Sequence, residues 1–167
     1  MKEVVIIEAL RTPIGAYKGA LKNMKAHKLG SILIREILKR SNINGNEIDE
    51  VIMGQVLITG MGQNPARQSA IDAGIPISKP AHIINQVCGS GLRAVISGYQ
   101  SIMLGDSKTV ITGGQENMSI SPHSIFYRDE KKISEDKLLD TMINDGLIDA
   151  FNNYHMGNTA ENVAKKF

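Results

Sequence analysis

The sequence predicts an α/β fold built on a mostly parallel sheet. Short apolar runs alternate with longer stretches of helical periodicity as far as about residue 117, in the order βαβαβαβ. The first run, VVIIEAL at residues 4–10, is apolar throughout except for Glu8, as expected of a strand covered on both faces. Because 42% of the 167 residues are hydrophobic, the chain can fill the core of an ordinary domain.

The first helix and the second strand follow in order. Leucine and isoleucine recur at three-to-four spacing over residues 29–38, with charged side chains on the other face, until SNINGN stops the pattern. The run at residues 51–59 then predicts a second strand. After it, Asn64 is placed to cap a second helix, Pro65 to occupy its first position and Gly74 to close it.

The third strand is predicted at residues 81–87. Apolar residues at helical spacing follow from Leu92 until GD at Gly105 ends the helix, and TVIT gives the fourth strand. From Ser121 the chain is more polar and only weakly periodic, so we expect an irregular excursion. The predicted division is therefore an α/β domain over residues 1–118 and the start of a loop domain over residues 119–167.

Near the end of this excursion, NTAE has the spacing of a helix-capping box. Asn158 would be the cap, and Glu161 stands three residues further on.

Charge, hydropathy and cysteine count exclude several classes of protein. Nineteen Lys and Arg against seventeen Asp and Glu leave a net charge of +2, too little for sequence-independent binding to nucleic acid. No apolar run is long enough to span a bilayer, and the start turns charged too soon for a secretory signal, so we expect no membrane partner and a cytoplasmic protein. One cysteine allows neither an intrachain disulfide nor a thiolate zinc site, and the spacing of His27, His82 and His123 suggests no metal.

The single cysteine stands at a chemically favourable position. Cys88, in NQVCGSGLRAV, falls where the third strand hands over to a helix, the edge at which open α/β sheets place their sites. The free N–H groups of a helix N-terminus stabilise a thiolate and the oxyanion of a thioester under attack. Gly89 and Gly91 leave the approach open. These features favour a nucleophile over the alternative, a buried structural cysteine.

The residues around Cys88 also allow a dinucleotide-binding interpretation. Gly89, Gly91 and Ala94 fit G-x-G-x-x-A, and Glu116 lies near the end of the next strand, where an acid could meet a ribose. That fingerprint normally occupies the first βα turn, whereas here it would occupy the third. The nucleophile interpretation therefore ranks first.

The chain resembles the thiolases, most closely the acetyl-CoA acetyltransferases among them. The resemblance is carried by NQVCGSGLRAV and, in family order, by EALRTPIGAYKG, GQNPARQ, AGIP, GGQENMS, DGLIDAF and YHMGNTAEN. It implies a thiolase-like fold and an acyltransferase that condenses two acetyl-CoA into acetoacetyl-CoA and CoA, or runs the thiolytic reverse. By this resemblance Cys88 carries the acetyl group, and backbone N–H groups at Cys88 and Gly89 form an oxyanion hole.

The resemblance also assigns roles around this centre. In the loop domain Leu147 would line the pantetheine arm, and His155 and Met156 would face an acyl pocket kept short by methionine; for Leu147 and Met156, ordinary packing is an open alternative. Asn117 would orient the strand end by hydrogen bonds. Arg67 and Gln68 suit either a subunit contact or a solvated helix face.

The charged run at residues 127–137 is by default a solvated loop. In related enzymes a hairpin in this region joins dimers into tetramers, so the resemblance implies a homodimer or homotetramer.

Three further family motifs do not occur in these 167 residues. They are an Asn-Glu-Ala-Phe segment, a Gly-His-Pro segment whose histidine activates the nucleophile, and a second Cys-x-Gly segment. We therefore expect the front part of a longer thiolase of fatty acid metabolism, inactive by itself, with coenzyme A thioesters as substrates and no cofactor. The alternatives are a condensing enzyme like the ketoacyl synthases and a non-catalytic fragment that binds CoA.

Overall fold

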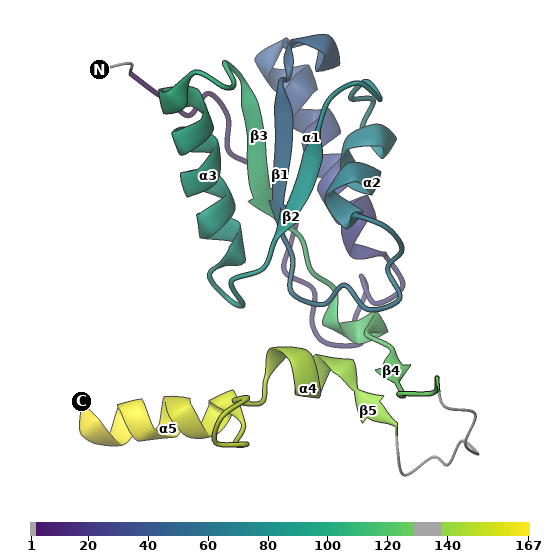
Figure 1. Cartoon of the computed structure of the whole chain (residues 1–167), viewed down its shortest axis with the longest axis vertical. Helices are drawn as coiled ribbons and strands as arrows, with labels where there is room; N and C mark the ends of the chain where they lie inside the picture. The colour runs from purple at the N-terminus through teal and green to yellow at the C-terminus, as the bar shows by residue number, and fades with distance from the viewer. Residues whose placement is uncertain (1–2, 129–137) are drawn as a thin grey trace.

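The computed structural model, which describes residues 3–128 and 138–167, is centred on a three-stranded parallel sheet (Figure 1). The strand order is β2-β1-β3, with β1 at Glu50–Gly54, β2 at Ala81–Ile84 and β3 at Val110–Gly114. Helix α3 (Ser90–Leu104) covers one face, and α1 (Ala26–Ser41) and α2 (Pro65–Asp72) cover the other (Figure 1). The predicted parallel α/β class is confirmed.

The hydrophobic core lies between β1 and the helix pair α1 and α2. Val51 and Met53 of β1 pack there against Ile34 of α1 and the small residues Ala66 and Ala70 of α2. Small side chains let α2 approach α1 closely. Burial of this apolar surface is the main force that fixes both helices on the sheet.

The ends of α2 follow the predicted signals. Asn64 Oδ1 accepts a hydrogen bond from Arg67 N at 3.1 Å, Pro65 is the first helical residue, and Gly74 lies just beyond the helix with φ +95°. Arg67 donates to the carbonyl oxygens of Lys79 and Ile77 at 2.8 and 2.6 Å. Gln68 Nε2 donates to those of Met61 and Gln63, both at 2.9 Å. Both side chains therefore hold the loops beside α2, a role that the sequence did not indicate.

The strand predicted at residues 4–10 is wrong. Among the residues that the structure describes, this segment pairs with no strand, and the side chains of Val5, Ile6 and Ile7 are 65%, 78% and 65% exposed. A run of apolar residues shows a tendency to be buried in a sheet, but a strand also needs a neighbouring backbone, and residues 4–10 pair with neither edge of β2-β1-β3.

The strands β1 and β2 also end earlier than predicted, at Gly54 and Ile84 instead of 59 and 87. Gln55 N still donates to the Ile84 carbonyl at 3.1 Å, but the next two N–H groups, of Val56 and Leu57, are taken by a carboxylate. A side chain thus replaces the neighbouring strand as acceptor. Sequence periodicity does not indicate where a side chain will take over from a neighbouring strand as hydrogen-bond acceptor.

Beyond β3 the chain is irregular, as predicted, although it contains short elements. These are the 3₁₀ turn η2 (Met118–Ile120), the antiparallel pair β4 (His123–Ser124) and β5 (Leu139–Asp140), and the helices α4 (Thr141–Gly146) and α5 (Met156–Lys166). A further 3₁₀ turn, η1 (Gly45–Glu47), follows α1. The charged run predicted as a solvated loop falls mostly on residues 129–137, outside the described residues. The domain boundary at residue 118 stays a prediction.

The predicted cap of the last helix is wrong. Helix α5 begins at Met156, and its N-cap is His155, whose Nδ1 accepts a hydrogen bond from Gly157 N at 2.9 Å. Asn158 lies inside the helix, because the imidazole nitrogen satisfies a free N–H group before Asn158 is reached. Among the described helices, none is both long and apolar enough to cross a membrane.

Candidate active site

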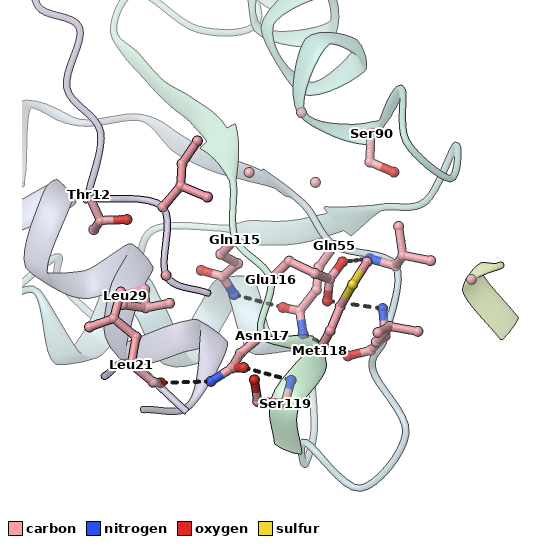
Figure 2. Close-up of a pocket in the computed structure, with 18 of the residues that line it drawn as sticks. Thr12, Leu21, Leu29, Gln55, Ser90, Gln115, Glu116, Asn117, Met118 and Ser119 are labelled. Atoms are coloured by element: carbon pink, nitrogen blue, oxygen red, sulfur yellow. Dashed lines mark hydrogen bonds between the residues drawn. The ribbon is translucent and has the colours of Figure 1, made fainter. Parts of the chain in front are cut away.

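A cleft of about 720 Å³ opens at the carboxyl ends of β1 and β3, beside the start of α3 (Figure 2). Its walls come from the segment before α1, the loops that follow β1 and β3, the turn between β2 and α3, and the end of α4. Residues from these segments include Thr12, Gln55, Cys88, Glu116 and Leu147. The cleft therefore occupies the edge at which open parallel sheets place their sites.

Cys88 lies on the turn between β2 and α3, and its side chain is exposed. The alternative of a buried structural cysteine is therefore wrong. Within the described residues the Cys88 N–H donates no hydrogen bond, whereas the Gly89 N–H donates to the Gln86 carbonyl at 3.0 Å. Of the two N–H groups predicted for an oxyanion hole, the one on Cys88 is thus the available donor.

The start of α3 sits directly on the end of β1. A Cβ built on Gly54 would lie 2.5 Å from Gly91 N and 2.6 Å from the Ser90 carbonyl oxygen, closer than real contacts allow. A Cβ on Gly91 would stand 3.7 Å from the Cα of Gly114 at the end of β3. The backbones at Gly54, Gly91 and Gly114 therefore approach one another closely, which seats the start of α3 on the ends of β1 and β3.

Glu116, just beyond the end of β3, is one of the residues that line the cleft. Its carboxylate accepts hydrogen bonds from Val56 N at 2.8 Å and Leu57 N at 3.3 Å (Figure 2). Burial raises the pKa of Glu116, and the two backbone hydrogen bonds oppose that rise. The dinucleotide-binding interpretation made this carboxylate a ribose ligand, but in the structure it accepts hydrogen bonds from backbone N–H groups of its own chain.

A chain of buried amides connects α2 with the same loop. Ser69 Oγ donates to Gln115 Oε1 at 2.6 Å, and Gln115 Nε2 donates to Gln55 Oε1 at 2.9 Å. Gln55 Nε2 then donates to the Leu57 carbonyl at 3.0 Å. The three side chains are buried, and each satisfies a polar group of the next. Glutamine at the end of two neighbouring strands is the one sequence signal that could have indicated this connection.

Asn117 acts through hydrogen bonds, as predicted. Its Nδ2 lies 3.1, 3.2 and 2.7 Å from the carbonyl oxygens of Leu21, Lys22 and Met24, and its Oδ1 accepts from Ser119 N at 2.9 Å (Figure 2). It thus ties the segment before α1 to the end of β3.

The residues predicted from the loop domain divide into two groups. Leu147 lines the cleft together with Cys88. His155 and Met156 are not among the residues that line it; His155 is exposed and caps α5. The acyl-pocket roles of His155 and Met156 stay predictions.

A parallel α/β unit with an exposed cysteine at a strand-to-helix turn, above a cleft, is the arrangement of an enzyme that uses a thiol as nucleophile. The family described as "Thiolase, N-terminal domain" matches residues 4–167, so the chain belongs to the thiolase family. This membership argues against the dinucleotide-binding interpretation and leaves Gly89 and Gly91 as parts of the cysteine turn.

The relatives that the chain matches are more specific. It is 50% identical over 167 residues to an acetyl-CoA acetyltransferase of Paracoccus denitrificans, covering 100% of this chain and 43% of the relative. It is 52% identical over 164 residues to the cytosolic acetyl-CoA acetyltransferase of Rattus norvegicus, covering 98% and 41%.

A solved structure agrees with both relatives. The crystal structure of Acat5 thiolase from Ascaris suum in complex with coenzyme A superposes with a TM-score of 0.86 at 36% identity, covering 94% of this chain and 41% of that one. The chain thus spans less than half the length of each relative.

Proposed function

We propose that this chain carries the nucleophile of an acetyl-CoA acetyltransferase. The observation that supports this most directly is the exposed thiol of Cys88 beside the N-terminus of a 15-residue helix, at the mouth of the cleft. Helix N-termini favour negative charge, so both a thiolate and a developing oxyanion are stabilised there. The names of the relatives favour acetyl-CoA as the substrate.

The first half of the reaction uses groups of this chain. Cys88 Sγ, after loss of its proton, attacks the thioester carbon of acetyl-CoA, and the carbonyl oxygen becomes an oxyanion that accepts a hydrogen bond from the Cys88 N–H. When the tetrahedral intermediate collapses, the bond to the CoA sulfur breaks and CoA leaves with a proton. The acetyl group is then bound to Cys88 as a thioester.

The second half of the reaction requires a base. A proton must leave the methyl carbon of a second acetyl-CoA before that carbon attacks the acetyl-cysteine and releases acetoacetyl-CoA. The 167 residues contain no Gly-His-Pro segment and no second cysteine. We therefore propose that complete condensation, or thiolysis in reverse, depends on residues outside this sequence.

The finer assignments belong to the same proposal. Leu147 would contact the pantetheine arm, with His155 and Met156 near the acyl group, and no cofactor besides the CoA thioesters is required. We further propose a cytoplasmic homodimer or homotetramer in fatty acid metabolism, with acetyl-CoA and acetoacetyl-CoA as its small-molecule partners.

The proposal is tested by mass spectrometry of the intact chain after incubation with acetyl-CoA, alone and with a segment that supplies the two missing motifs. We expect one acetyl group, located on Cys88 by peptide mapping and removed by added CoA. Cys88→Ser is the matched control and should stay unmodified. If no adduct forms on the wild-type chain in either mixture, the assignment is contradicted. If, in addition, CoA binds wild type and Cys88→Ala equally well, a non-catalytic CoA-binding fragment is favoured.

A further inference from the structure

The residue before Cys88 has an unfavourable backbone conformation. Val87 has φ +48°, in the left-handed region, which a β-branched side chain rarely adopts. Val87 is also 49% exposed, so only part of its side chain packs against other residues. The surrounding structure must therefore hold it.

Ser90 supplies most of that restraint. Its hydroxyl, in a residue that is only 3% exposed, donates to the Val87 carbonyl at 2.6 Å and accepts from Gln86 N at 2.8 Å. Ser90 N donates to the same Val87 carbonyl at 3.1 Å. On the other side, Asn85 Oδ1 accepts from Val87 N at 3.0 Å. Both peptide groups that flank Val87 are thus fixed by hydrogen bonds.

The Ser90 hydroxyl does not serve the helix that Ser90 begins. The N-cap of α3 is Gly89, which makes no side-chain hydrogen bond, and both partners of the Ser90 hydroxyl lie upstream, on the turn that carries Cys88. Ser90 itself is seated by the close contact between its carbonyl and Gly54. Ser90 therefore links the turn that carries Cys88 to the end of β1, and Figure 2 shows its side chain at the start of α3.

We propose that Ser90 is a positioning residue for the nucleophile: its hydroxyl keeps Val87 in the left-handed conformation and so holds Cys88 at the N-terminus of α3. This inference rests on the proposed function, in which Cys88 is acylated. Without the hydroxyl, Val87 relaxes to negative φ, and Cys88 moves away from the N–H groups at the start of the helix. Ser90 touches no reacting atom and acts only through the turn.

The experiment measures alkylation of Cys88 by iodoacetamide in the 167-residue chain, as the ratio of the rate in the folded state to that in urea. Ser90→Ala should lower this ratio roughly three- to tenfold, the range expected for loss of one buried hydrogen bond. Ser31→Ala is the matched control: Ser31 is equally buried, and its Oγ donates to the Lys28 carbonyl in α1 at 3.0 Å. It should leave the ratio unchanged even if the urea midpoint falls.

Rescue separates positioning from general destabilisation. Asparagine adopts the left-handed conformation far more readily than valine, so Val87→Asn added to Ser90→Ala should restore most of the lost rate. Asn85→Ala, on the exposed side of the same turn, is a second test that leaves the buried serine intact. It should also slow alkylation and also be rescued by Val87→Asn.

Two results would overturn the proposal: an unchanged ratio in Ser90→Ala, or no rescue by Val87→Asn in either background. If Ser90→Ala does not fold, the Asn85→Ala pair decides by the same criterion. Because the probe is iodoacetamide, a failure of acetyl-CoA to modify the wild-type chain would contradict the proposed function and leave this result standing.

Discussion

Glu116 shows how one residue can shape a wall of the site without touching the nucleophile. Its carboxylate binds two consecutive N–H groups just beyond the end of β1, and burial raises its pKa. The pKa of Glu116 in the folded chain therefore lies above the ordinary value of 4.5. Between the unfolded and the folded pKa, the native state binds more protons than the unfolded state.

The free energy of unfolding should consequently carry a contribution from Glu116 that is fully present below the unfolded pKa and is lost as pH rises through the folded pKa. Glu116→Gln abolishes this contribution, because an amide does not titrate. Urea unfolding of both chains at several values between about pH 4 and pH 7 measures the difference. Wild-type stability should fall relative to the variant as pH rises across the window.

Glu161→Gln is the control for this prediction, since it removes one exposed carboxylate from α5. It should follow the wild-type trend. A stability difference between wild type and Glu116→Gln that stayed constant with pH would show that Glu116 does not titrate differently in the two states.

At this scale the sequence predicted the place of Cys88 and the hydrogen-bonding role of Asn117, but not Glu116, the glutamine pair or Ser90. Glu116 and Val56 stand 60 positions apart, as do Gln55 and Gln115. Local patterns report on neighbours within a helix turn or a strand, and they contain no information on such pairs. Ser90 lies beside Cys88, yet its role depends on the φ of Val87, which a single sequence does not display.

Among the elements, the contact of α3 with β1 determines where the cysteine turn stands. Gly54 has no room for a Cβ, because the backbone of Ser90 and Gly91 occupies that space. Gly113 in the neighbouring strand β3 has room, since a Cβ there would make an ordinary contact at 3.8 Å with the Met53 side chain.

Gly54→Ala should therefore force α3 away from the sheet and lower the free energy of unfolding by about 3 kcal/mol, at the upper end for overpacking, because backbone cannot give way as a side chain can. Gly113→Ala, the matched control, should change it by less than about 1 kcal/mol. Urea unfolding followed by circular dichroism measures both. Equal effects of the two substitutions would mean that α3 can shift freely, contrary to the close contact.

Helices were predicted better than strands, and the reasons are physical. The signals at the ends of α2 act within a few residues of the chain, so Asn64, Pro65 and Gly74 could be assigned from sequence. A strand requires a neighbour, and residues 4–10 have an apolar sequence without one among the strands described. The cap of α5 differs from the prediction because NTAE has the capping-box spacing at Asn158, whereas the ring nitrogen of His155 accepts the N-terminal hydrogen bond three residues earlier.

On the scale of the whole molecule, the sheet with its covering helices and the last helix, α5, differ in how much of their surface is buried. Val51 and Ile52 of β1 are almost fully buried, whereas α5 has no buried residue and Phe167 at its end is 94% exposed. A helix of eleven residues is marginal in water without packing. The stability of the chain should therefore be unevenly distributed.

Hydrogen exchange of backbone amides tests this expectation. Amides of β1 should exchange only through global unfolding, and those of α5 should exchange at rates close to an unstructured peptide. The measurement is repeated at several protein concentrations. Protection of α5 equal to that of β1 at every concentration would contradict the prediction, and protection that grew with concentration would indicate that copies of the chain cover the helix.

The family was the most predictable property at this scale. Seven motifs in family order extend over almost the whole chain, and the family match covers residues 4–167. The order and spacing of long motifs can identify the family even when the predicted ends of single strands are wrong, because the motifs are distributed over the whole fold. The pairing of residues 4–10 is a different matter, since the motif EALRTPIGAYKG begins only at Glu8 and contains no information on strand pairing.

The buried amides behind the cleft have a direction. Ser69 donates to Gln115, Gln115 to Gln55, and Gln55 to the Leu57 carbonyl, so each amide can be oriented in one sense only. Rotating one amide by half a turn would set oxygen against oxygen and nitrogen against nitrogen, and its neighbours would have to rotate too. Because the Leu57 carbonyl at the end of the series can only accept, even a concerted rotation would leave the Gln55 amide oxygen facing it, so the observed orientation is the one that satisfies every member of the series.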